Sequence, residues 1–527
     1  MRRRTLLAAS AVALAPALAP AIVRAAAATT LRFVPVIDLA FTDPIFAAAA
    51  QVSRTHGLMV FDTLYGMNTR LEVSPQMLEG QTTSTDGKQW DLRLRDGLLW
   101  HDGSPVLARD CTASIRRWAA RDGMGTALLA ATDELSAPDD RTIRFRLKRP
   151  FPLLPYALGK VAVPACFMMP ERLATNDPFK PVTDIVGSGP YRYKADERLA
   201  GARNVYERND KYVPRPGAAA DWTSGAKIVH FDRVEWTTMP DAGTAIAALQ
   251  AGEQDWQENA PHDLLPVLRR SPNIQIRVLD PLGFTCSLQV NHLQPPFNNP
   301  AIRHAVMGAV DQAAFMGAIA GGNPEYQHIP CGFFTPGTPM ASDTGMAALT
   351  SPRDYARIKA ELARAGYAGE RVVLLVPTDS VVQKPLGDVA ADMLQKAGLN
   401  VEYAGMSFGQ TLTRRASKAL VDAGGWSAVV GNPQGMDWLN PVGHQALGGA
   451  AAYAGWYDSP RMVGQRTEWL EASVLADQQR ICRDIQQTAF DEVPYYPVGQ
   501  YKQPTAHRTR VTGIGAGTAT FWGVRPA

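Results

Sequence analysis

The sequence predicts an α/β protein with mixed sheets flanked by helices, and three observations lead to this fold class. The chain has 527 residues, which is too long for one ordinary hydrophobic core and indicates two or three domains. Residues 90–118 change from the alternating apolar pattern of a strand to the helical spacing of Cys111, Ile115 and Trp118. Residues 354–403 follow the patterns of a helix, a strand, a helix and a strand, so they predict a β-α-β unit with parallel strands.

Composition is typical of a soluble globular protein and argues against a nucleic-acid partner. Hydrophobic residues make up 46% of the chain and charged residues 20%. The formal net charge is +3, but residues 1–28 carry four arginines and no acid, so the remainder has a charge of −1. Binding to a phosphate backbone needs clustered basic charge, which a nearly neutral protein does not supply.

Residues 1–28 have the three parts of an export signal. An arginine triplet at 2–4 forms the basic start, residues 6–23 are apolar, and residues 23–25 (VRA) can serve as a cleavage site. The order RRTLL is typical of a twin-arginine signal, the export route for folded proteins. A membrane anchor is the alternative, but the two prolines of this stretch make it a poor permanent span. No lipobox cysteine follows the signal, so we expect cleavage and a free periplasmic protein.

The five cysteines are widely spaced and odd in number, which allows at most two disulfides even in an exported protein. No CxxC motif occurs among Cys111, Cys166, Cys286, Cys331 and Cys482. Cys111 and Cys482 lie on the apolar faces of predicted helices. We therefore expect both to be buried as small apolar side chains.

Several runs of the chain share their pattern with one protein family. LRDGLLWHDGSPV ends at residue 106, GSGPY ends at residue 191, and QVNHLQPPFNNPAIRH ends at residue 304. Residues 242–251 form a predicted helix that Gly252 ends, followed by the pair Asp255-Trp256. Together these runs resemble the family 5 extracellular solute-binding proteins, which are the receptors of ABC importers for dipeptides, oligopeptides, nickel and related solutes.

The resemblance implies a two-lobed α/β periplasmic binding protein of class II, with a discontinuous first lobe and an extra subdomain inserted in it. Residues 280–283 (DPLG) are a natural linker by composition, and we take them as the passage from the first lobe to the second. The predicted limits are 1–28 for the signal peptide, 29–65 for the first part of lobe 1, 66–185 for the inserted subdomain, 186–280 for the second part of lobe 1, 281–484 for lobe 2 and 485–527 for the return to lobe 1.

Motifs for catalysis are missing from the sequence. It contains no GxSxG, no P-loop lysine and no HExxH, and its nine histidines are scattered without the spacing of metal ligands. The glycine cluster at 513–517 is not followed by a helical pattern, so we expect neither a catalytic site nor a metal or cofactor. An exported hydrolase is one alternative, but it would need a nucleophile–base pair. A folding helper for other exported proteins is another, and it would bind unfolded chains without lobe closure.

Residues 424–457 form a glycine-rich stretch with five aromatic side chains, which is more usual at ligand surfaces than in packing. In peptide receptors of the family, the equivalent region resembles G-W-x-A-D-Y, and its aspartate holds the α-ammonium group of the ligand. This chain has Val429 at that position, and valine cannot balance a buried ammonium. Asp437 in the same stretch could take over this role; the alternative is an aspartate in a surface turn.

The resemblance therefore implies a monomeric receptor that captures a di- or oligopeptide and delivers it to an inner-membrane ABC permease. A non-peptide solute, such as a metal chelate, an opine or a sugar derivative, is the alternative within the same class. The candidate ligand contacts are Tyr65, Phe284, Trp426, Asn432, Asp437 and Trp438.

Overall fold

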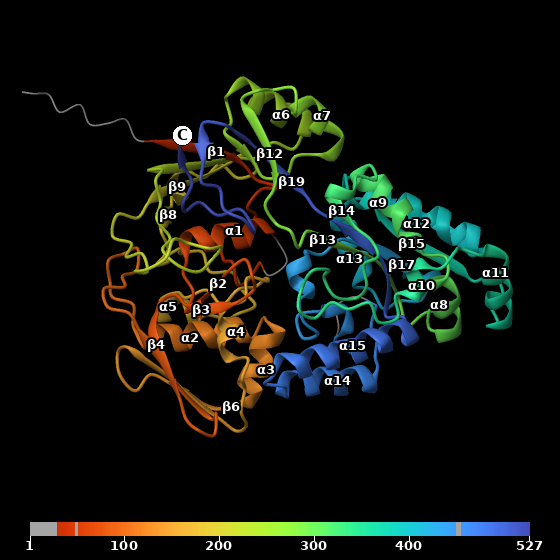
Figure 1. Cartoon of the computed structure of the whole chain (residues 1–527), viewed down its shortest axis with the longest axis horizontal. Helices are drawn as coiled ribbons and strands as arrows, with labels where there is room; N and C mark the ends of the chain where they lie inside the picture. The colour runs from red at the N-terminus through yellow and green to blue at the C-terminus, as the bar shows by residue number, and fades with distance from the viewer. Residues whose placement is uncertain (1–28, 48–50, 450–454) are drawn as a thin grey trace, which may run out of the picture.

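The computed structural model describes residues 29–47, 51–449 and 455–527 and has two lobes, each built on a mixed β-sheet (Figure 1). The predicted signal at 1–28 lies outside the described residues, as does Tyr453 of the aromatic stretch. No helix among the described residues is long and apolar enough to cross a membrane.

The sheet of the first lobe has seven strands in the order β12-β19-β11-β1-β10-β9-β8. Its central strand β1 pairs in parallel with β10 and β11, and the outer strands pair antiparallel. The strands are β1 (Thr30–Val34), β8 (Tyr191–Tyr193), β9 (Arg203–Arg208), β10 (Arg233–Thr237), β11 (Trp256–Gln257), β12 (Ile274–Val278) and β19 (Pro504–Arg508). The helices of this part are α1 (Gln51–Val60), α6 (Ala242–Ala251) and α7 (Leu265–Leu268).

A four-stranded antiparallel sheet, β4-β5-β7-β6, forms a separate layer within the segment 66–185. The predicted strand and helix of residues 90–118 are confirmed as β5 and α2, and Asp110 accepts a hydrogen bond from the Leu107 amide at the start of α2. The elements here are β4 (Leu78–Thr83), β5 (Gln89–Leu94), β6 (Thr132–Ser136), β7 (Thr142–Leu147), α2 (Ala108–Ala119), α3 (Gly123–Ala131), α4 (Leu154–Gly159) and α5 (Glu171–Ala174), with the small ribbon β2 (Tyr65–Met67) and β3 (Val73–Pro75) beside them.

The second lobe is built on six strands in the order β14-β18-β13-β17-β15-β16. The predicted β-α-β unit is confirmed, because β15 and β16 pair in parallel along their whole length and α12 connects them. The strands are β13 (Phe284–Val290), β14 (Gln327–His328), β15 (Arg371–Pro377), β16 (Asn400–Met406), β17 (Ala428–Gly431) and β18 (Tyr495–Tyr501). The helices are α8 (Pro300–Met307), α9 (Gln312–Ala320), α10 (Ala347–Thr350), α11 (Tyr355–Arg364), α12 (Gln383–Ala397), α13 (Phe408–Arg415), α14 (Pro460–Glu471) and α15 (Leu475–Glu492). A short ribbon, β20 (Val511–Thr512) and β21 (Arg525–Pro526), lies at the C-terminus.

The chain passes from one sheet to the other twice, and the two passages lie side by side. Residues 279–283, which include the predicted linker, connect β12 to β13, and residues 502–503 connect β18 back to β19. The Gln500 side chain donates a hydrogen bond to the Leu282 carbonyl. A Cβ on Gly283 would lie 2.2 Å from the carbonyl oxygen of Tyr501, so the close approach of the passages requires glycine.

The predicted limit at residue 485 falls inside α15, which packs against α14 and α8, whereas the change of sheet follows β18. The passage between the lobes therefore lies later than this limit. The sequence could not indicate this, because a strand pattern does not specify which sheet the strand joins. The other domain limits stay predictions. The five cysteines are free and buried, which confirms the expectation for Cys111 and Cys482.

Candidate functional site

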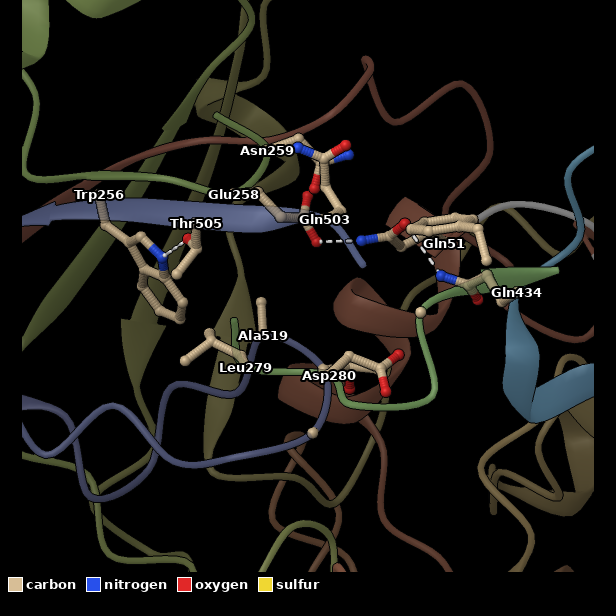
Figure 2. Close-up of a pocket in the computed structure, with 14 residues that line it drawn as sticks. Gln51, Trp256, Glu258, Asn259, Leu279, Asp280, Gln434, Gln503, Thr505 and Ala519 are labelled. Atoms are coloured by element: carbon tan, nitrogen blue, oxygen red, sulfur yellow. Dashed lines mark hydrogen bonds between the residues drawn. The ribbon is translucent and has the colours of Figure 1, made fainter. Parts of the chain in front are cut away.

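A cavity lies beside the two passages and is lined by residues of both lobes (Figure 2). The room in it for the centres of water molecules is about 40 Å³, and the whole hollow of about 420 Å³ includes open solvent. The polar and aromatic side chains that line it include Gln51, Glu258, Asp280, Phe284, Gln434 and Gln503. Gln51 and Glu258 belong to the first lobe, Gln434 belongs to the second, and Asp280 and Gln503 lie in or next to the passages.

A chain of hydrogen bonds joins the lobes across this cavity. The Gln51 amide donates to Glu258 Oε1 at 2.8 Å, and the Gln434 amide donates to Gln51 Oε1 at 2.9 Å, as Figure 2 shows. Arg54 Nη1 donates to Gln434 Oε1 at 2.5 Å. Both ends of the Gln434 amide are therefore held by α1 of the first lobe.

The lobes also touch away from the cavity. The Asn440 amide of the second lobe donates to the Tyr156 hydroxyl at 3.0 Å, and Arg149 forms an ion pair with Glu471 at 2.6 Å. Because these contacts join the inserted segment to the second lobe, the structure has the two lobes closed against each other.

Arg54 is a cation that interacts with a group of three acids. Its side chain is buried, and its Nε and Nη2 atoms have no hydrogen-bond partner among the described residues. Burial lowers the pKa of Arg54, while the charges of Asp437, Asp280 and Glu258 act in the opposite direction. No ion pair joins Arg54 to any of these three acids in the described part of the chain. The guanidinium and the carboxylates are thus close enough to interact but are not paired.

The pKa values of three carboxyl groups are raised by full or partial removal from water: Glu258 is buried, whereas Asp280 and Asp437 are half-buried. Burial raises the pKa of Asp280 and of Asp437 to about 6 each, and it also raises the pKa of Glu258. Glu258 accepts hydrogen bonds from the Gln51 side chain and the Val36 amide. Asp437 Oδ1 has no hydrogen-bond partner among the described residues, so it is open to a donor that a ligand brings.

Of the six predicted contacts, Phe284 lines the cavity, while Asn432 and Asp437 interact with residues around it without lining it. Phe284 stacks on the Tyr501 ring, with the centroids 5.1 Å apart and the planes at 11°. Asn432 donates to the Tyr501 hydroxyl at 3.1 Å and accepts from the Gln383 amide at 2.9 Å. Asp437 interacts with Arg54, as described above. Phe284 and Asn432 are thus brought together around Tyr501.

The other three predicted contacts are packed inside the lobes and do not line the cavity. The Tyr65 ring is buried, and its hydroxyl donates to Gln81. Trp426 is fully buried in an apolar cluster with Val373, Leu375 and Val429. Trp438 stacks on the His444 ring at 4.2 Å. As ligand contacts these three residues stay predictions, and the proposals below do not use them.

Gln51, Arg54, Glu258 and Gln434 were not among the predicted site residues. No pattern in the sequence indicated Arg54; the structure shows that it belongs to a helix whose positions 52–60 are all buried. Asp280 was recognised only as part of the linker. The absence of metal ligands stays a prediction. Burial lowers the pKa of His444 to about 3, and its ring bonds the Tyr495 hydroxyl at 2.9 Å. The described residues contain no group of three or more potential metal ligands.

Comparison with known proteins identifies the family. A family model described as bacterial extracellular solute-binding proteins, family 5, middle, matches residues 72–446. The chain is 36% identical over 535 residues to a probable peptide ABC transporter periplasmic-binding protein, y4tO, of Sinorhizobium fredii, with 99% of this chain and 98% of that protein covered. It is 24% identical over 484 residues to the glutathione-binding protein GsiB of Pectobacterium atrosepticum, with 90% and 88% covered.

Solved structures share the fold. AgaA from A. tumefaciens R10, in complex with agropinic acid, superposes with a TM-score of 0.77 at 19% identity, covering 94% of this chain and 99% of that one. DppA from Helicobacter pylori, in complex with the peptide STSA, superposes with a TM-score of 0.76 at 20% identity, covering 94% and 98%. The family match, the relative at 36% identity and the shared fold lead to one conclusion: the chain belongs to the bacterial extracellular solute-binding proteins of family 5.

Proposed function

We propose that this protein is the periplasmic solute-binding component of an ABC importer, which captures a small solute between its two lobes and delivers it to an inner-membrane permease. The observation that supports this function most directly is the position of the cavity. It lies at the two passages between the lobes and is lined from both of them. A solute held there contacts both lobes at once, so its binding energy favours the closed arrangement that a permease can recognise.

The solute class that we propose is a di- or oligopeptide. The relative y4tO is named as a probable peptide-binding protein, and the DppA structure holds a peptide. Neighbouring structures with agropinic acid or Ni(L-His) make an opine or a metal chelate the alternative. Monomeric receptor function and removal of residues 1–28 as an export signal belong to the same proposal. The cavity lined by both lobes of one chain supports the first of these.

Asp437 is our proposed partner for the α-ammonium group of the peptide. By the family resemblance, Val429 occupies the position at which peptide receptors carry an aspartate. It lies in the apolar cluster around Trp426. Asp437 Oδ1, in contrast, is a buried atom of a half-buried residue and has no hydrogen-bond partner among the described residues. An ammonium group supplies both the charge and the donor that this oxygen lacks.

The experiment that tests this function is a thermal-shift screen of the chain without residues 1–28, against dipeptides, tripeptides, opines, sugars and metal chelates. A solute that binds only the folded protein raises the melting temperature by mass action. We expect shifts with peptides that have a free amino terminus and smaller or no shifts with their N-acetyl forms. The Asp437→Asn variant removes the charge at constant shape and should abolish this difference, while Asp422→Asn, an exposed aspartate of the same lobe, should keep it. Shifts confined to sugars, or a complete absence of shifts, would contradict the peptide assignment.

A further inference from the structure

The charges that meet between the closed lobes do not balance. Arg54 from α1 contributes one positive charge, and Glu258 after β11, Asp280 in the passage and Asp437 of the second lobe contribute three negative charges when ionised. We propose that closure of the lobes is opposed by the charge of Asp280 and Asp437, so that protons, or a cationic group of the captured solute, drive it. The solute half of this inference rests on the proposed function; the proton half does not.

The other charged group that faces these acids does not restore the balance. Lys160, which follows α4, is the additional cation that acts on Asp437. It forms a buried ion pair with Asp122 at 2.8 Å, so its charge is already compensated within the first lobe. Asp280 is influenced by Arg54 and Asp437, and Glu258 by Arg54. The excess of negative charge therefore stays with the group between the lobes.

The surroundings make this excess costly. An apolar cluster joins the lobes next to Asp437 and the passages, and its buried members are Met67, Val161, Trp222, Leu282, Met436 and Leu439. Arg54 Nη1 also donates a hydrogen bond to the Met436 sulfur at 2.7 Å. Carboxylates beside such side chains lose part of their hydration. The hydrogen bonds that Glu258 accepts from the Gln51 side chain and the Val36 amide, and that Asp280 accepts from the Leu282 amide, replace only part of it, because no ion pair to these acids occurs in the described part of the chain. When the lobes separate, the acids that lie between them regain water.

The direction of the pH effect follows from the two states. In the closed structure the pKa values of Asp280 and Asp437 are each about 6, and in the hydrated open state we expect the ordinary value of 3.8. The closed state thus binds more protons, so closure becomes more favourable as pH falls through 6 towards 4, and this gain is absent well above pH 6. Between pH 7.5 and pH 5.0 the closure equilibrium should rise by about tenfold for each carboxyl, and by on the order of a hundredfold for both.

Small-angle X-ray scattering of the solute-free chain without residues 1–28 tests this inference at pH 7.5 and pH 5.0, with circular dichroism to verify that the protein is folded at both. We expect a larger radius of gyration at pH 7.5 than at pH 5.0. The double variant Asp280→Asn/Asp437→Asn keeps the shapes without the charges and should be compact at both pH values. The control Asp133→Asn/Asp477→Asn removes two exposed carboxylates, one from each lobe, and should behave like the unchanged protein.

Equal radii at the two pH values in the unchanged protein would overturn the inference, and this result does not depend on any variant folding. A double variant that opens and closes with pH as the unchanged protein does would also overturn it, because the response would then come from other groups. The scattering series contains no solute. It can therefore fail while the thermal-shift screen identifies a peptide, and it can succeed while that screen finds none.

Discussion

Replacing Gln434 by alanine should weaken solute binding without unfolding the protein. The Gln434 side chain accepts a hydrogen bond from Arg54 and donates one to Gln51, and both partners belong to the first lobe. A hydrogen bond to a charged group contributes about 1.5 to 3 kcal/mol and a neutral one about 0.5 to 1.5 kcal/mol. The closed state should therefore lose about 2 to 4 kcal/mol relative to the open state, which corresponds to roughly a 30- to 1000-fold weaker affinity.

Isothermal titration calorimetry with the peptide that gives the largest thermal shift measures this loss, and guanidinium unfolding measures stability. The matched control is Gln479→Ala, because Gln479 is a half-buried glutamine of the second lobe whose side chain donates to the Pro339 carbonyl of the same lobe. We expect the control to bind like the unchanged protein. An affinity of Gln434→Ala within threefold of the unchanged protein would refute the role of these bonds in closure. A loss of unfolding free energy as large as the loss of binding would show that Gln434 stabilises the fold instead.

Three further predictions address the fold, its pH dependence and the cavity. Lys227→Met breaks a buried ion pair with Asp62 at 2.8 Å and should cost about 3 to 5 kcal/mol in guanidinium unfolding; a cost below 1 kcal/mol would contradict this. Burial holds the pKa of His444 at about 3, below the usual 6.5, so unfolding takes up a proton and stability is lost as pH falls from 6.5 towards 3. His444→Phe should therefore lessen the difference in unfolding free energy between pH 7.5 and pH 4.5 by about 2 to 3 kcal/mol. An unchanged difference would count against a neutral buried ring. Phe284→Ala should weaken peptide binding by roughly 2- to 12-fold through the lost aromatic contact. Trp426→Ala should instead lower the free energy of unfolding by about 3 to 5 kcal/mol and leave the peptide affinity of the folded protein unchanged. The reverse pattern would place Trp426, not Phe284, at the ligand.

Local patterns were sufficient to predict the parts of the fold that depend on neighbouring residues. The spacing within residues 354–403 predicted the parallel pair β15 and β16, because apolar periodicity distinguishes a buried strand from an amphipathic helix. The composition of residues 280–283 indicated the first passage between the lobes. The second passage was placed too early. β18 is a buried strand, and its partners β13 and β14 lie about 200 residues earlier in the chain.

The candidate site could be predicted only in part for the same physical reason. Phe284 and Asp437 were selected because one follows a linker and the other lies in a glycine-rich stretch, and both are local signals. The bond between Arg54 and Gln434 joins residues 380 positions apart, and no periodicity of a single sequence reports such a contact. Trp426 was selected as an aromatic residue among glycines, but it precedes β17 and fills the space against β15 inside the lobe.

The most direct test of a receptor that closes around its solute is small-angle X-ray scattering at pH 7.5, with and without a saturating concentration of the peptide that gives the largest thermal shift. We predict that the peptide decreases the radius of gyration, because a solute in the cavity contacts both lobes and holds them together. The same radius with and without peptide, under conditions where calorimetry shows the peptide bound, would contradict capture by lobe closure.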